Sequence, residues 1–188
     1  TKQTDQTHIC LGARGFNLFD PRKYVAQLMA TVLDGGMSSR MFISVRERKG
    51  LVYYVSTMCD SDTDTGSVIT RAGIDNTKVE KAVATIVSEY KKIKRQKVSD
   101  SELKKAKNYI RGKTYLGLEA SDDVAEFLGG QEILENQILS TEEILKHLES
   151  VTPKQVQGVA REMFVPEHMN LALVGPFEDK SKFEELIG

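Results

Sequence analysis

The segment that decides the fold of this chain is Gly35-Gly36-Met37-Ser38-Ser39-Arg40-Met41-Phe42, which continues through Val45-Arg46-Glu47-Arg48-Lys49-Gly50 into Leu51-Val52-Tyr53-Tyr54-Val55. Glycine commonly ends helices and serine commonly begins them, so the segment predicts a helix end, a second helix that stops at Gly50, and then a strand. Arg46 falls near the end of the second helix and Tyr53 near the start of the strand. A cation and a phenol fixed at such a corner can hold a peptide carbonyl and a developing oxyanion.

The residues after this segment predict a β-hairpin. Strands are expected over 51–59 and 66–74, on either side of the polar turn Asp60-Ser61-Asp62-Thr63-Asp64. Because side chains alternate along a strand, Tyr53 and Tyr54 should point to opposite faces. We therefore expect one of them to pack against helices and the other to face a cleft.

The residues before the segment predict a strand and a helix. His8 to Gly12 reads as a first strand, with Gly15 in the turn that follows. Asp20 and Pro21 supply the cap and first position of a helix that ends at Gly35. The apolar residues of that helix recur at helical spacing: Val25, Leu28, Met29, Val32 and Leu33.

The rest of the chain predicts a helical block and a final strand. Four helix starts carry a cap with a partner residue shortly after it: Thr77 with Glu80, Ser99 with Glu102, Ser140 with Glu143, and Thr152-Pro153 with Gln155. Ser121-Asp122-Asp123 opens another helix, expected to break or bend at Gly129-Gly130. Met169 to Val174 is a last strand, followed by a short helix with Phe183, Leu186 and Ile187. This order predicts an α+β fold, a largely antiparallel sheet with helices packed on one face, as a single domain over 1–188.

Composition excludes several classes of protein. The chain has 188 residues, with 26 Lys plus Arg against 27 Asp plus Glu, so nothing indicates nucleic acid as a partner. No uncharged run exceeds ten residues, which predicts no membrane span. The polar start is typical of a linker, and we expect the chain to be cut from a longer protein. Cys10 and Cys59 both fall in strands and are expected to be small buried thiols.

Motifs for metal or phosphate binding are weak. His8, His147 and His168 show no ligand spacing, and a site built from His8, Cys10 and Cys59 would lack a fourth ligand, so we expect no metal site. Gly112-Lys113-Thr114 ends like a P-loop but lies in a helical pattern. Arg46 and Tyr53 have an ordinary interpretation too, in which Arg46 pairs with a surface carboxylate and Tyr53 packs in the sheet.

The pattern Gly-Gly-Met-Ser-Ser-Arg-Met-Phe at 35–42, followed by Val-Arg-Glu-Arg-Lys-Gly-Leu-Val-Tyr at 45–53, resembles the C-terminal, non-catalytic domain of the pitrilysin and processing-peptidase family of zinc peptidases, the inverzincins. The resemblance extends over nearly the whole chain, including the first strand, the helix at Asp20-Pro21, the helix start at 98–107 and the closing strand at 170–175.

The resemblance implies two similarly folded halves that face each other across a chamber. The N-terminal half carries a His-x-x-Glu-His zinc motif, whose Glu acts as general base for a zinc-activated water. The C-terminal half lends an Arg and a Tyr seven residues apart, and Arg46 and Tyr53 stand at those positions. Tyr53 would then donate to the developing oxyanion, and Arg46 would fix a neighbouring carbonyl. Gly35, Gly36, Ser38 and Ser39 would contact the substrate, an extended peptide.

This chain lacks His-x-x-Glu-His, so by itself it should hydrolyse nothing. Zinc is expected on the other half, supplied upstream on the same chain or by a catalytic partner subunit. The short glycine pair Gly35-Gly36 differs from the long glycine loop of the regulatory processing-peptidase subunit and resembles the bacterial peptidases, which suggests a soluble protein of the bacterial cytoplasm. The isolated half could also form a homodimer through the apolar face that normally meets the other half.

Two alternatives remain. The chain could be a scaffold or regulatory subunit of the same fold, like the core subunits of the respiratory cytochrome c reductase. It could also be a peptide-binding module that adds a strand to its ligand through a sheet edge.

Overall fold

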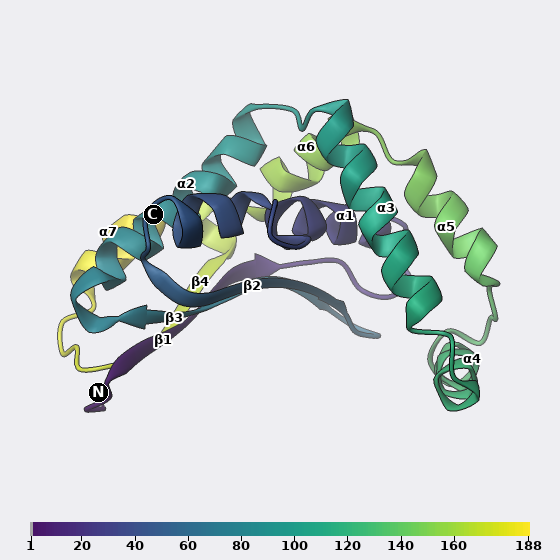
Figure 1. The fold of residues 1–188 in the computed structure, drawn as a ribbon, viewed down its shortest axis with the longest axis horizontal. Coiled ribbons are helices and arrows are strands. Elements are labelled where there is room, and N and C mark those ends of the chain that lie inside the picture. The colour runs from purple at the N-terminus through teal and green to yellow at the C-terminus, as the bar shows by residue number, and fades with distance from the viewer. Residues whose placement is uncertain (1) are drawn as a thin grey trace.

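The computed structural model describes residues 2–188 and places all its strands in one four-stranded antiparallel sheet. The strands are β1 (Gln6–Arg14), β2 (Val52–Ser61), β3 (Gly66–Asp75) and β4 (Met169–Val174), in the order β2-β3-β1-β4. Figure 1 shows the sheet arching beneath the helices, most of which lie above one of its two faces. The predicted α+β class, with an antiparallel sheet and helices on one face, is confirmed.

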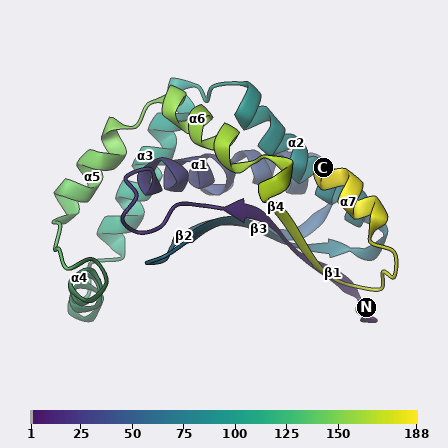
Figure 2. The same cartoon turned by 180° about the vertical axis from the view of Figure 1, so that it is seen from behind.

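The helical layer is assembled from segments on both sides of the hairpin. Its helices are α1 (Lys23–Asp34), α2 (Val79–Arg95), α3 (Asp100–Leu116), α4 (Ser121–Glu135), α5 (Thr141–Ser150), α6 (Pro153–Met163) and α7 (Ser181–Ile187). Seen from behind in Figure 2, α1, α2, α6 and α7 lie over the sheet, while α3 and α5 descend past one end to reach α4. The sheet therefore has one face covered by helices and one face that no helix of the described chain covers.

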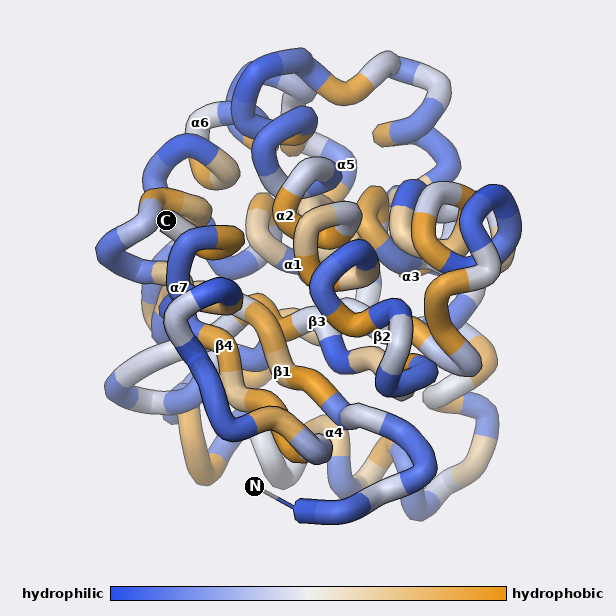
Figure 3. Tube along the Cα trace, turned by 90° about the vertical axis from the view of Figure 1, so that its left-hand side faces the viewer, coloured by the Kyte–Doolittle hydropathy of each residue, from blue (hydrophilic) through white to orange (hydrophobic). Residues whose placement is uncertain are grey.

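The hydrophobic core lies between the sheet and the helices. On β1 the side chains of Ile9, Leu11 and Ala13 are buried, and on β3 those of Val68, Ala72 and Ile74 are buried. Figure 3 shows β1 and β4 as largely apolar strands beneath the helices. Tyr90 of α2 anchors the two layers, because its hydroxyl lies 2.6 Å from Thr70 Oγ1 and 3.1 Å from the carbonyl oxygen of Leu11. We call this side of the sheet the covered face.

The opposite side, which we call the uncovered face, carries the alternate residues of each strand. On β1 these are His8, Cys10, Gly12 and Arg14, and Cys10 is exposed. The expectation that Cys10 is buried was therefore wrong, because no described helix packs over this face. Cys59 meets the expectation in part: it is half-buried against the core, and burial raises the pKa of its thiol to about 12.

Most helices begin where the sequence predicts. Ser99, Ser140 and Thr152 each form the expected capping box at the start of α3, α5 and α6. The hairpin of β2 and β3 and the short α7 also lie where they were predicted. These features depend on hydrogen bonds between residues close in sequence, which explains their agreement with the local pattern.

Three local predictions were wrong. The Asp20 carboxylate accepts the Arg22 N–H (2.8 Å) and forms a turn, so α1 begins at Lys23 and Pro21 precedes it. Thr77 and Glu80 form no capping box, because Asp75 accepts the Thr77 N–H and hydroxyl and starts a 3₁₀ turn before α2. The expected break at Gly129-Gly130 is absent: α4 continues through both glycines, since glycine weakens a helix interior by only about 1 kcal/mol.

Candidate functional site

The second helix of the deciding segment is a single π-helical stretch, Phe42–Glu47. A helical turn at Arg40 and Met41 leads into it, and Ser39 caps that turn, since its hydroxyl accepts the Phe42 N–H (3.4 Å) and its carbonyl accepts the Ile43 N–H (3.1 Å). A helix with a serine cap was predicted, and its wider π geometry was not. Short π segments are frequent at functional sites, which draws attention to the residues at its end.

The π-helix ends at Glu47, and the turn that follows it stops at Gly50, where the sequence predicts the helical segment to stop. Gly50 has a φ of +55°, the left-handed conformation that glycine adopts without steric cost. Its N–H bonds to the carbonyl of Arg46 (3.0 Å), and the Leu51 N–H bonds to the carbonyl of Val45 (3.0 Å). The chain thus reverses and enters β2 with Arg46 on one side of the corner and Tyr53 on the other.

A β-bulge at the start of β2 sets the position of Tyr53. Val52 pairs with Ile74 and Tyr54 pairs with Gly73, which leaves Tyr53 as the additional residue. Val52 is buried, while Tyr53 and Tyr54 are 54% and 42% exposed. The expectation that one of the two tyrosines packs against helices was therefore wrong, because the bulge interrupts the alternation on which it was based.

Tyr54 lies on the uncovered face and is held across the sheet. Its ring covers Gly73, where a Cβ would stand 2.5 Å from Tyr54 Cε1. The Tyr54 hydroxyl lies 3.1 Å from Nδ1 of His8 on β1. The two contacts fix the strand immediately after the bulge and so fix the backbone from which Tyr53 projects.

Arg46 is exposed at the end of the π-helix. Its Cζ lies 5.1 Å from the centre of the Phe42 ring, a cation–π contact. Within residues 2–188 its guanidinium forms no ion pair with a carboxylate. The ordinary interpretation, a surface ion pair and a tyrosine packed in the sheet, does not describe the positions of Arg46 and Tyr53.

The residues of the glycine loop differ in exposure. Gly35 follows α1, and Gly36 (φ +93°) and Ser38 are at the surface. Ser39 is only 6% exposed, and its hydroxyl lies 3.4 Å from the Asp34 carboxylate. Gly35, Gly36 and Ser38 are thus accessible to a ligand, whereas Ser39 lies beneath them and supports the loop.

Asp34 is a residue that sequence analysis missed. Its carboxylate accepts the Thr57 N–H of β2 (2.8 Å), which ties the end of α1 to the sheet. Burial raises the pKa of Asp34, although the Thr57 and Ser39 hydrogen bonds oppose the shift. An acidic residue at a helix C-terminus is unfavourable for the helix dipole, and this was the available signal. Asp34 also lines a groove of about 580 Å³ between α1, β2 and α3.

Arg40 ties the other end of the loop to α3. Its Nε and Nη2 donate to the two carboxylate oxygens of Glu102 at 2.9 and 3.1 Å. Burial alone would raise the pKa of Glu102, but the hydrogen bonds from Arg40 and from Ser99 outweigh it and lower the pKa. The loop that precedes Arg46 is therefore held at both ends by carboxylates.

The described residues do not fit a zinc ion. His8 contacts Tyr54, His147 stacks on Tyr24 with ring centres 4.9 Å apart, and His168 Nδ1 lies 3.2 Å from the carbonyl of Glu162. Within residues 2–188, no group of three or more His, Cys, Asp or Glu side chains could hold a metal ion. No helix of that part of the chain is long and apolar enough to cross a membrane.

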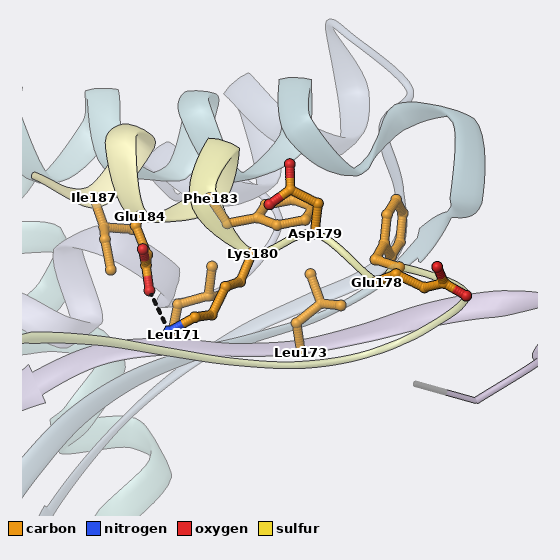
Figure 4. Close-up of a pocket in the computed structure, with 9 residues that line it drawn as sticks. Leu171, Leu173, Glu178, Asp179, Lys180, Phe183, Glu184 and Ile187 are labelled. Carbon is orange, nitrogen blue, oxygen red and sulfur yellow. Dashed lines mark ion pairs between the residues drawn. The ribbon is translucent and has the colours of Figure 1, made fainter.

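A further pocket lies between β4 and α7, away from the residues predicted as a site. Figure 4 shows Leu171 and Leu173 of β4 beneath Phe183 of α7, with the Lys180–Glu184 ion pair at the side. The pocket has a volume of about 250 Å³. None of the six predicted site residues lines it, and its apolar walls continue the hydrophobic core.

Comparison with known proteins identifies the class. Residues 1–110 match the family described as the peptidase M16 inactive domain, and the chain belongs to this family. It is 33% identical over 175 residues to YmxG, an uncharacterized zinc protease of Bacillus subtilis, and 31% identical over 179 residues to an uncharacterized zinc protease of Streptomyces coelicolor. These alignments cover 93% and 95% of this chain but 42% and 39% of the relatives, so the chain spans about two-fifths of their length.

The fold is shared with solved members of the family. The crystal structure of a peptidase M16 inactive domain from Pseudomonas fluorescens matches with a TM-score of 0.83 at 20% identity. The match covers 94% of this chain and 42% of that one. The resemblance to the pitrilysin and processing-peptidase family inferred from residues 35–53 is confirmed.

Proposed function

We propose that this chain is the substrate-positioning, non-catalytic half of a zinc endopeptidase, one domain over 1–188 of C-terminal type. The observation that carries the proposal is the corner between the π-helix and β2. There, Arg46 and Tyr53 are both exposed, and the Arg46 guanidinium has no carboxylate partner in the described chain. A bulge that turns a tyrosine outward costs ladder hydrogen bonds, and bulges of this kind gather beside active sites.

In this proposal the two side chains act on the backbone of an extended peptide. The Tyr53 hydroxyl donates a hydrogen bond to the scissile carbonyl oxygen as negative charge develops on it. The Arg46 guanidinium donates to a neighbouring carbonyl and holds the peptide in register. Gly35, Gly36 and Ser38 contact the substrate backbone, and Ser39 positions them through Asp34.

The catalytic zinc, in this proposal, belongs to another half of the peptidase. That half is either an N-terminal part of the same polypeptide or a partner subunit. Two observations support the assignment: the described residues offer no zinc site, and the named zinc proteases are more than twice as long as this chain.

The proposed function is tested by Tyr53→Phe in the complete peptidase. Removing one oxyanion donor is expected to lower kcat for peptide hydrolysis by about 10²–10³-fold, without loss of folding, because the Tyr53 ring is exposed. The matched control is Tyr115→Phe, an equally exposed tyrosine (52%) on α3, which should leave kcat unchanged. Equal turnover by Tyr53→Phe and the wild type would refute the role of this hydroxyl.

The same assay separates the rival functions. A wild-type protein that hydrolyses no peptide would support the scaffold. A strand-adding module would need a free sheet edge, but at β2 the outward N–H of Thr57 is already bonded to Asp34. This contact interrupts the edge and favours the peptidase over strand addition there.

One exposed apolar surface indicates where another protein domain could bind. Leu116, Ile133, Leu134 and Ile138 are exposed on and beside α4, at the end of the arch in Figure 1. We propose that this surface meets the catalytic half, and that in the isolated chain it drives formation of a homodimer.

A further inference from the structure

Arg71 stands at the centre of the uncovered face. It lies on β3, where it pairs with Cys10 of β1 on one side and Ser56 of β2 on the other. The side chain is exposed, and within residues 2–188 its guanidinium has no ion-pair or hydrogen-bond partner. Its two neighbours are small, so the space around the guanidinium is open.

No carboxylate of the described chain is placed to neutralise Arg71. The acidic residues on the same face are Asp60 and Asp75, each two side-chain rows away along the strands, about 14 Å. The Asp75 carboxylate is already bonded to Thr77. An opposite charge at a facing position on a neighbouring strand would stabilise the sheet, but Cys10 and Ser56 occupy the positions that face Arg71.

Arg71 is the first charged side chain beyond the Tyr53 corner. The next row of the uncovered face toward the corner is Gly73 with Tyr54 and His8, about 7 Å from the Arg71 row, and the His8 ring contacts the Tyr54 hydroxyl. Beyond Arg71 lies a shallow depression of about 250 Å³, lined mostly by apolar atoms of Cys10, Ile69 and Ala172 and bounded by Arg14. An extended peptide that leaves Tyr53 across this face meets a cation first and an apolar surface second.

We infer that Arg71 selects an acidic side chain, Asp or Glu, in the peptide held by this domain, about two to four residues from the bond next to Tyr53. The inference rests on the proposed function and adds a specificity determinant to it. A guanidinium binds a carboxylate through two parallel hydrogen bonds, a geometry that lysine or a neutral side chain does not offer. Because Arg71 has no partner in the described chain, it can make these bonds without breaking an existing ion pair.

The test uses the complete peptidase and a set of quenched fluorescent peptides that carry one Glu, Gln or Lys at each successive position. At one position, Glu is expected to raise kcat/KM by about three- to tenfold over Gln. Arg71→Gln should abolish this preference, and Arg71→Glu should reverse it in favour of Lys. Arg95→Gln, which removes an exposed arginine from the end of α2, is the matched control and should keep the wild-type preference.

A second measurement separates this inference from the proposed function. Fluorescence anisotropy with the same peptides, labelled and added to the complete protein in the presence of a chelator, reports binding without turnover. Peptide hydrolysis with an identical positional preference in the wild type and in Arg71→Glu would overturn the role of Arg71 and leave the peptidase intact. Charge-dependent binding without any hydrolysis would keep Arg71 and remove the proposed function. Neither hydrolysis nor binding would overturn both.

Discussion

The two faces of the sheet are built from alternate residues of the same four strands, yet they differ in almost every property. The covered face presents side chains such as Leu11 and Ile74 that are fully buried against the helices. The uncovered face presents Tyr54, Cys10 and Arg71, all exposed, and Arg71 lacks an ion-pair or hydrogen-bond partner in the described chain. The covered face is packed against the helices, whereas the uncovered face is the one on which we propose that a peptide binds. Along each strand, residues that stabilise the fold thus alternate with residues of the proposed binding face.

The largest effect is expected from Leu11→Ala on the covered face. Leu11 is completely buried, so truncation removes apolar contacts and leaves a cavity, which should lower the free energy of unfolding by about 2–5 kcal/mol. Cys10→Ala, one residue away on the uncovered face, should change it by less than about 0.5 kcal/mol. Urea denaturation of both variants measures the difference, and equal losses would contradict the separation of the two faces.

Two glycines on the uncovered face, Gly12 and Gly73, test whether every substitution on that face has a small effect on stability. At Gly12 an added Cβ would overlap the carbonyl oxygen of Val68, which is part of the backbone of β3 and cannot rotate away as a side chain can. Gly12→Ala should therefore lower the free energy of unfolding by about 1–3 kcal/mol, although Gly12 belongs to the uncovered face.

Gly73→Ala is the matched control for Gly12→Ala. Its Cβ would meet side chains and no backbone: the ring of Tyr54, which can move with loss of the contact with His8, and the Gln6 amide oxygen at 3.4 Å. Thermal denaturation should show a smaller loss for Gly73→Ala than for Gly12→Ala. The reverse order would mean that the Tyr54–His8 contact carries more stability than its exposure suggests.

The smallest effect concerns Asp34, which joins the loop of the candidate site to the sheet. The folded-state pKa of Asp34 is raised above the ordinary 3.8. At pH values between 3.8 and the folded-state pKa, the folded protein therefore binds a proton at Asp34 more readily than the unfolded chain does. Stability therefore rises as pH falls through this window and is lost as pH rises through the folded-state pKa. Asp34→Asn should remove this contribution while its amide oxygen still accepts the Thr57 N–H.

The measurement is urea denaturation of both proteins across acidic pH. Asp179→Asn is a control of opposite sign, because hydrogen bonds from the Ser181 N–H and hydroxyl lower the pKa of Asp179, whose contribution is lost as pH falls. Parallel pH profiles for the wild type and Asp34→Asn would show that the carboxyl does not titrate differently in the folded protein.

The local predictions that were correct depend on interactions between residues close in sequence. The capping boxes at Ser99, Ser140 and Thr152 and the helix stop at Gly50 each depend on residues no more than a few positions apart. The failures at Asp20 and Thr77 were also local, and in both places an aspartate formed a competing turn before the helix. For the candidate site, sequence supplied Arg46 and Tyr53 but not their surroundings.

By itself, the sequence determined the order of helices and strands, the antiparallel hairpin, the family and the two residues at the corner. The order of elements and the hairpin follow from local hydrogen bonding and from the period of apolar residues, whereas the family and the two corner residues follow from the resemblance carried by residues 35–53. Only the tertiary structure decided that Tyr53 is exposed by a bulge, that Ser39 lies beneath the loop, and that Arg71 has no partner in the described chain. Each of these depends on residues from distant strands and helices meeting in a particular register, and a one-residue change of register would reverse the faces.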